Sequence, residues 1–186
     1  MRVLLTSAGL ETQAIRACFE GLVGKDMSLV RALFIPTAAI DAEAIAVLPK
    51  CMNDLLQCGI PNAHITVYDL HAGMDLEALR RYDVVYLCGG RTRYLLERIN
   101  DTKFNESLTA YIHDSGVVVG VSAGSLIFAN NLSGNLGLLD TKLDVHCATG
   151  EKAGRLTPPL GERLRLTNES ALVIRDPRDG LEIIGE

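Results

Sequence analysis

The stretch VVVGVSAGSLIFA, residues 117–129, changes in its middle from one secondary-structure pattern to another. Its first residues are mostly β-branched, as in a buried strand, and its last residues form an apolar run typical of a helix. Between them lies Gly-Val-Ser-Ala-Gly at positions 120–124. The sequence therefore predicts a strand that turns into a helix at Ser122.

Such a turn has chemical consequences for Ser122. A strand that reverses into a helix within two residues needs small neighbours, and Gly120, Ala123 and Gly124 are small. The serine side chain then projects above the sheet, and the N–H of Ala123 points to where an oxyanion forms. The pattern predicts a serine nucleophile; the alternative is a serine that only caps a helix over 123–130.

Short apolar runs alternate with longer amphipathic stretches along most of the chain. The predicted strands are 2–6, 31–36, 64–69, 83–88 and 116–121, and the predicted helices are 10–23, 41–58, 92–99, 103–114 and 123–130. This alternation predicts an α/β fold: a right-handed, doubly wound, mostly parallel sheet sandwiched by helices. Its ligand crevice would lie at the carboxyl ends of the strands.

The C-terminal part follows a different pattern. ALVI (171–174) and LEII (181–184) flank RDPRDG, whose Asp179-Gly180 is a turn signal, so we expect a hairpin that extends the sheet at one edge. A further helix is predicted around PPLGERLRL (158–166). No repeat or linker-like tract divides the sequence, so we expect a single α/β domain over residues 1–186.

Composition narrows the function classes. The chain has 186 residues, 48% hydrophobic and 22% charged, which suits a soluble domain with a core. A net charge of -5 favours neither nucleic acid nor an anionic membrane as partner. No apolar run reaches the length of a bilayer span, and VLLT after Met1-Arg2 is too short for a secretory leader. We expect a cytoplasmic protein, and the oligomeric state stays open, a homodimer included.

The five cysteines are odd in number and match no zinc spacing. We therefore expect reduced thiols in a reducing compartment and no bound metal. A nucleophilic Cys88 or Cys147 is the alternative to a serine nucleophile, but neither occupies a strand-to-helix turn.

A serine nucleophile needs a base, and four histidines are available. His146, in LDVHCATG, lies downstream of Ser122 in a loop-like setting and is the favoured base. His64 begins a predicted strand, and His71 follows that strand in a polar loop. His113 ends a predicted helix, where a favourable interaction with the helix dipole explains a histidine. The alternative for His146 is a hydrogen-bonded loop histidine.

A second glycine-rich turn lies in LCGGRTRYLLERI, residues 87–99, between a predicted strand and a predicted helix. The N–H of Gly90 can serve as a second oxyanion donor, and we assign Gly89, Arg91, Thr92 and Arg93 to substrate binding. The two arginines suit an anionic group such as a carboxylate. The alternatives are a tight βα turn and solvated surface charges.

Four segments together resemble a known family. GVSAGS (120–125), CGGRTRYLL (88–96), FIPTA (34–38) and DVHCATGEKAGRL (144–156) are similar to the serine peptidases that include dipeptidase E (α-aspartyl dipeptidase) and cyanophycinase. The resemblance implies the fold of class I glutamine amidotransferases, a flavodoxin-like three-layer arrangement. It implies Ser122 as nucleophile, and the backbones of Gly90 and Ala123 as oxyanion donors. His146 matches the catalytic histidine of cyanophycinase.

The sequence departs from the family pattern at three places. Arg91 and Arg93 replace the usual Asn and Phe of the glycine motif, which puts aspartyl specificity in question. Cys147 replaces an aromatic residue. The acid of the triad would lie in LTNESALVI (166–174), where register places Asn168 at its position and Glu169 next to it. Either can orient His146 by accepting its N–H, and we favour Asn168.

The resulting hypothesis is a serine peptidase of the dipeptidase E type, which hydrolyses small peptides, N-terminal Asp dipeptides among them, through an acyl-enzyme. It needs no cofactor. An amidase or esterase acting on another small acyl compound would use the same residues, and a non-catalytic ligand-binding protein of the same fold is the third hypothesis.

Overall fold

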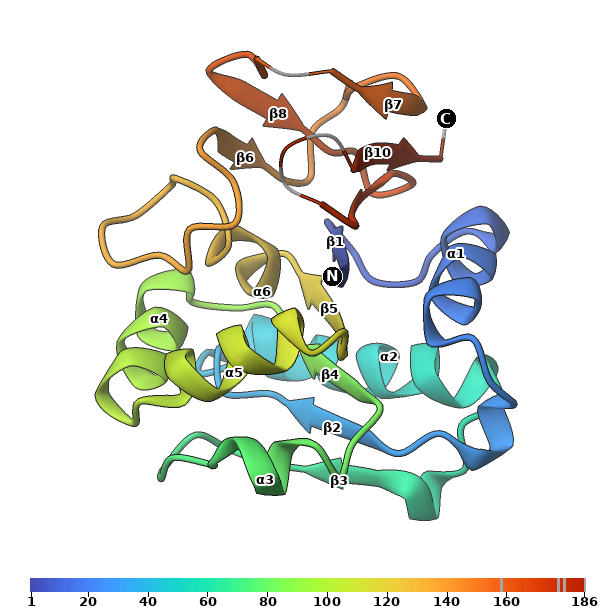
Figure 1. Cartoon of the computed structure of the whole chain (residues 1–186), viewed down its shortest axis with the longest axis vertical. Coiled ribbons are helices and arrows are strands. Elements are labelled where there is room, and N and C mark those ends of the chain that lie inside the picture. The colour runs from blue at the N-terminus through green and yellow to red at the C-terminus, as the bar shows by residue number, and fades with distance from the viewer. Residues whose placement is uncertain (158, 177, 179, 186) are drawn as a thin grey trace.

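An eight-stranded sheet runs through the protein in the order β3-β2-β4-β5-β1-β9-β10-β7. The computed structural model describes residues 1–157, 159–176, 178 and 180–185. Figure 1 shows these strands from β3 at the bottom of the view to β7 near the top. Their bounds are β1 Arg2–Thr6, β2 Ala32–Ile35, β3 Ile65–Val67, β4 Val84–Leu87, β5 Val117–Val121, β7 Gly154–Leu156, β9 Ala171–Ile174 and β10 Leu181–Ile184.

The strands from β3 to β1 are parallel, whereas β9, β10 and β7 pair antiparallel. The register pairs Leu87 of β4 and Leu5 of β1 with Gly120 of β5. The carboxyl ends of these three strands are therefore level, so the loops that follow them meet at one edge of the sheet. The predicted mostly parallel α/β sheet is confirmed.

Helices cover both faces of the sheet, because alternate strand residues point to opposite sides and nearly all are apolar. Val3 and Leu5 pack with one buried cluster, and Leu4 packs with the other. The first face carries α3 (Leu76–Leu79), α4 (Thr92–Asp101), α5 (Phe104–His113) and α6 (Ala123–Leu126). The second carries α1 (Gln13–Val23) and α2 (Ala42–Gln57), and Figure 1 shows α2 behind the sheet and α5 in front. Two short 3-10 turns are η1 (Met27–Leu29) and η2 (Asn62–His64).

The C-terminal hairpin is confirmed, but its place in the sheet differs from the prediction. β9 and β10 pair antiparallel, and β7 lies outside β10, so the hairpin is not the edge. The sequence around Gly154 gives little strand signal, because β7 has only three residues and most are exposed. Asp179 of the predicted turn lies outside the described residues.

The predicted helix around 158–166 is wrong. Residues Arg163–Arg165 form β8, which pairs in parallel with β6 (Lys142–Asp144) in a separate two-stranded sheet. Leu164 and Leu166 are buried while Arg163 and Arg165 are exposed, which is the two-residue period of a strand. Pro158, at the start of the predicted helix, lies outside the described residues.

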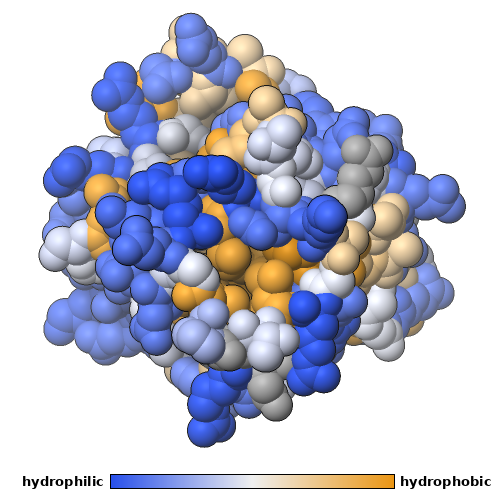
Figure 2. Space-filling view, turned by 90° about the horizontal axis from the view of Figure 1, so that it is seen from above, coloured by the Kyte–Doolittle hydropathy of each residue, from blue (hydrophilic) through white to orange (hydrophobic). Residues whose placement is uncertain are grey.

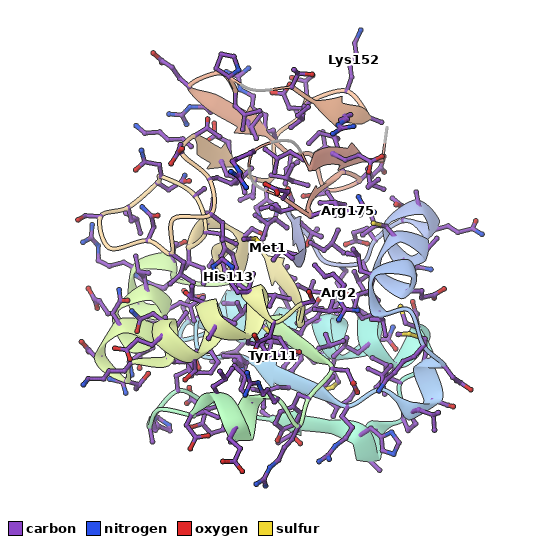
Figure 3. All side chains as sticks on the ribbon, viewed as in Figure 1. Met1, Arg2, Tyr111, His113, Lys152 and Arg175 are labelled. Atoms are coloured by element: carbon purple, nitrogen blue, oxygen red, sulfur yellow. The ribbon has the colours of Figure 1, made fainter. Side chains whose placement is uncertain are left out.

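The end of the molecule that carries β6, β7 and β8 is mainly hydrophilic around a hydrophobic hollow (Figure 2). Met1 and Arg175 lie near each other (Figure 3), and the Met1 ammonium donates to the Arg175 carbonyl at 3.0 Å. In the described part of the chain, no helix is long and apolar enough to cross a membrane.

Candidate active site

Ser122 has a backbone conformation that few non-glycine residues adopt. It follows β5 directly, with φ 49° and ψ −108°, and it is the N-cap of α6. Its side chain makes no capping hydrogen bond. The hydroxyl is thus not used to hold the helix, which argues against the capping alternative.

The small residues around Ser122 allow α6 to lie against the sheet. A Cβ on Gly120 would be 2.5 Å from the carbonyl oxygen of Gly124, and a Cβ on Gly124 would be 2.3 Å from that of Leu87. Both contacts are with backbone atoms, which cannot move aside cheaply. The Oγ of Ser125, which is buried, lies 2.8 Å from the carbonyl oxygens of both Gly120 and Thr6 and so ties the turn to β1.

His146 lies next to the serine hydroxyl. Its Nε2 is 3.1 Å from the Oγ of Ser122, a hydrogen-bond distance, across a separation of 24 residues in sequence. His146 also has a positive φ of 58°, although it is not a glycine. The imidazole is therefore held at the serine by a strained loop, not by a helix or strand.

Asn168 occupies the third place in this chain of contacts. Its Oδ1 lies 2.8 Å from Nδ1 of His146. An amide oxygen is an acceptor, so it places the imidazole proton on Nδ1 and leaves Nε2 free to accept from Ser122. Glu169 is exposed, and no hydrogen bond or ion pair between its side chain and His146 is present in the described chain. Of the two candidates, the structure places Asn168 against the histidine.

Ser7, which sequence reasoning missed, joins the two loops that carry His146 and Asn168. The backbone N–H of His146 donates to its Oγ at 3.1 Å, and its hydroxyl donates to the Leu166 carbonyl at 3.1 Å. Ser7 is fully buried and directly follows β1. A sequence signal existed: a small polar residue follows a predicted strand that ends at the same sheet edge as β5.

Two backbone N–H groups near Ser122 have no hydrogen-bond partner among the described residues. Ala123 begins α6, and no acceptor for its N–H or for that of Gly90 is present among the described residues. Gly89 lies against Ser122, since a Cβ on Gly89 would be 3.2 Å from that of Ser122. Gly90 has φ 137°, and a Cβ there would be 2.1 Å from the Ala38 carbonyl oxygen. Only glycine fits at Gly90, because a side chain there would collide with the backbone of Ala38.

A pocket of about 370 Å³ opens over Ser122 and His146. Helix α2 forms its far wall, which sequence reasoning missed. The pocket is lined by Ser7, Ala8, Asp41, Glu43, Ala44, Val47, Leu48, Lys50, Cys51, Gly89, Gly90, Val121, Ser122 and His146. The helix begins where the sequence predicts: Asp41 is the N-cap, and its side chain accepts from the N–H of Ala44 at 3.0 Å.

The predicted substrate-binding residues divide into two groups. Gly89 lines the pocket, whereas Arg91, Thr92 and Arg93 are absent from its lining. The Nε of Arg91 lies 3.4 Å from a carboxylate oxygen of Asp41, and Arg93 is exposed on α4. Among the described residues, the only cation in the lining is Lys50, whose ammonium donates to the Ala8 carbonyl at 2.8 Å and pairs with Glu11.

Cys51 of the pocket lining lies in a cluster of buried titratable groups that includes Cys88 and Asp54. The neighbouring Cys88 thiol lowers the pKa of Cys51, while burial raises the pKa of Cys88. Burial also raises the pKa of Asp54, which accepts from the Leu10 N–H at 2.9 Å and from the Tyr86 hydroxyl at 2.8 Å. Cys88 therefore stays protonated, which argues against it as a nucleophile. No group of three metal-ligating side chains is found in the described chain.

Comparisons with solved structures show where this fold occurs. A crystal structure of a candidate peptidase E from Listeria monocytogenes EGD-e superposes with a TM-score of 0.74, at 19% identity, over 100% of this chain and 97% of that one. A peptidase from an acI-B1 Actinobacterium superposes with a TM-score of 0.65, at 15% identity, over 100% of this chain and 87% of that one. At these identities the likeness establishes the fold.

Sequence comparisons give information on the family of the chain as well as on its fold. An uncharacterized peptidase of Pasteurella multocida (strain Pm70) is 30% identical over 102 residues, 53% of this chain and 48% of that protein. The match thus spans about half the length of this curated relative. Residues 3–141 match the sequence model of Peptidase family S51, a range that includes Ser122 and ends before His146. The matched range covers more than half of the chain and contains Ser122 at the strand-to-helix turn. The chain therefore belongs to Peptidase family S51.

Proposed function

We propose that the protein is a serine peptidase that hydrolyses small peptides through an acyl-enzyme formed on Ser122. The observation that carries the proposal is the contact chain from Ser122 Oγ to His146 Nε2, at 3.1 Å, and from His146 Nδ1 to Asn168 Oδ1, at 2.8 Å. Ser122 and His146 line the pocket whose far wall is α2. Membership in a peptidase family supports the same reaction class.

In the first half of the reaction, Ser122 Oγ attacks the peptide carbonyl carbon and His146 Nε2 takes its proton. The carbonyl oxygen becomes an oxyanion beside the N–H groups of Ala123 and Gly90, which have no acceptor among the described residues. The imidazolium then gives its proton to the leaving amine as the C–N bond breaks. Asn168 keeps the ring oriented, since its oxygen accepts from Nδ1–H in both protonation states.

In the second half, a water molecule attacks the ester on Ser122. His146 takes a proton from this water and returns it to Ser122 Oγ as the acid product leaves. Each proton that His146 accepts is thus released again within one turnover.

The size of the pocket favours a short substrate. Its volume of about 370 Å³ is at the lower end of the range of about 300–1,000 Å³ for small-molecule sites. A dipeptide or a similar small peptide suits such a volume better than a polymer does.

Hydrolysis of a dipeptide library, followed by release of free amino acids, tests the proposal. The wild type should cleave some members, while Ser122→Ala and His146→Ala should each lose activity by a factor of about 10³ or more. Undiminished cleavage by either variant would overturn the assignment.

A further inference from the structure

We infer that the site selects peptides whose acyl residue, the one whose carbonyl Ser122 attacks, carries a positively charged side chain of the lysine or arginine type. The inference rests on the proposed function, and it differs from the aspartyl preference that the resemblance implies. It follows from the charges in the pocket wall.

Glu43 is the charged side chain of the pocket lining that has no hydrogen bond or ion pair among the described residues. The other two are engaged: Lys50 with Glu11 and the Ala8 carbonyl, and Asp41 with Arg91 and the first turn of α2. An incoming cation therefore finds an unpaired carboxylate, whereas an incoming carboxylate finds no free cation in the described lining. An aspartyl side chain would be repelled there.

The topology indicates which half of the substrate meets this carboxylate. His146 lies on the β1 side of Ser122, because its backbone N–H is hydrogen-bonded to the Oγ of Ser7, which follows β1. His146 protonates the leaving amine, so the leaving residue lies on that side. The acyl residue then extends the other way, over β4 and β2, where Asp41 and Glu43 begin α2.

The separation of the strands under the pocket suits a long substrate side chain. Two neighbouring strand spacings separate β5 from β2, about 10 Å in all. Ala44 and Val47, which follow Glu43 on α2, add apolar side chains to the pocket lining. An aliphatic stem can lie along these residues with its cationic head at Glu43, as lysine and arginine side chains do at protein surfaces.

Binding to an inactive variant tests the inference apart from turnover. Calorimetry of Ser122→Ala with Lys-Ala, Leu-Ala and Asp-Ala compares ligands that share the ammonium and the terminal carboxylate. We expect Lys-Ala to bind at least about five-fold more tightly than Asp-Ala, with Leu-Ala between them, and the difference to shrink in high salt. Equal or tighter binding of Asp-Ala, or binding of none of the three, would overturn the inference.

The second arm adds Glu43→Gln in the Ser122→Ala background, which should reduce the Lys-Ala to Asp-Ala affinity ratio about five-fold. Glu106→Gln is the matched control, because Glu106 is also an exposed acid in the first turn of a helix but lies outside the pocket lining. An equal Lys-Ala to Asp-Ala affinity ratio in Glu43→Gln and Glu106→Gln would show that Glu43 does not determine specificity. If the wild type cleaves no peptide while these affinities hold, the proposed function fails and the binding preference stands.

Discussion

Replacing Asn168 with aspartate should increase activity. The Oδ1 of Asn168 is 2.8 Å from Nδ1 of His146, and a carboxylate of the same shape accepts the same hydrogen bond. It also adds a negative charge beside the imidazolium that forms in the proposed reaction when Ser122 gives its proton to His146. A charge-assisted hydrogen bond is roughly twice as strong as a neutral one.

The size of the effect depends on screening by solvent. Two unit charges about 4 Å apart interact by about 4 kcal/mol at an effective dielectric constant of about 20. His146 and Asn168 are both exposed, however, and exposed ion pairs contribute about 1 kcal/mol or less. We therefore expect Asn168→Asp to raise kcat/KM about five-fold at neutral pH.

The opposite change removes the acceptor. Asn168→Ala leaves Nδ1 unpaired and the ring free to turn, and we expect kcat/KM to fall by at least about ten-fold. Glu169→Gln is the control, because the exposed Glu169 side chain makes no hydrogen bond or ion pair with His146 in the described chain. Steady-state kinetics on the best dipeptide measures all three variants. Full activity in Asn168→Ala together with a large loss in Glu169→Gln would refute the reasoning.

Three further predictions concern the surroundings of the site. Ser7→Ala removes the acceptor of the His146 N–H. We expect the free energy of unfolding in urea to fall by about 1–3 kcal/mol and kcat to fall as well. Wild-type values of both quantities would show that Ser7 does not hold His146 in place. Gly124→Ala places a Cβ against the Leu87 carbonyl and should lower the urea midpoint of unfolding. Gly21→Ala on α1, where the added Cβ meets nothing within 4 Å, should raise that midpoint. Equal midpoints for the two variants would contradict this prediction. Burial raises the pKa of Asp54 above 3.8, so ionisation of Asp54 costs stability as the pH rises through the raised pKa. The stability of Asp54→Asn relative to the wild type should therefore increase from acid to neutral pH in urea titrations, and a pH-independent difference would contradict it.

The parallel part of the fold could be predicted from sequence because each strand is a short apolar run buried on both faces. The valines of β5, Val117, Val118, Val119 and Val121, are all buried, and such a β-branched run is typical of a strand in the interior of a parallel sheet. The strands that were missed are short and mostly exposed: β6, β7 and β8 have three residues each. Pairing with distant segments determines such strands, and a local pattern does not contain that information.

The same distinction applies to the site. Ser122 can be recognised in the sequence because the turn requires glycines within two residues on either side. Lys50 and Glu43 lie far from Ser122 in sequence, and only the packing of α2 over the sheet edge brings them to the pocket. Arg91 looks like a substrate ligand in sequence, but its position next to Asp41 follows from the close approach of Gly90 to Ala38.

The central claim is that the Ser122 hydroxyl is activated by His146. Its most direct test is labelling with a fluorophosphonate probe, read by mass spectrometry of the intact protein and of its peptides. We predict one adduct per wild-type chain, on Ser122, no adduct in Ser122→Ala, and much slower labelling of His146→Ala. An adduct on another residue, or equal labelling rates in the wild type and in His146→Ala, would contradict the claim.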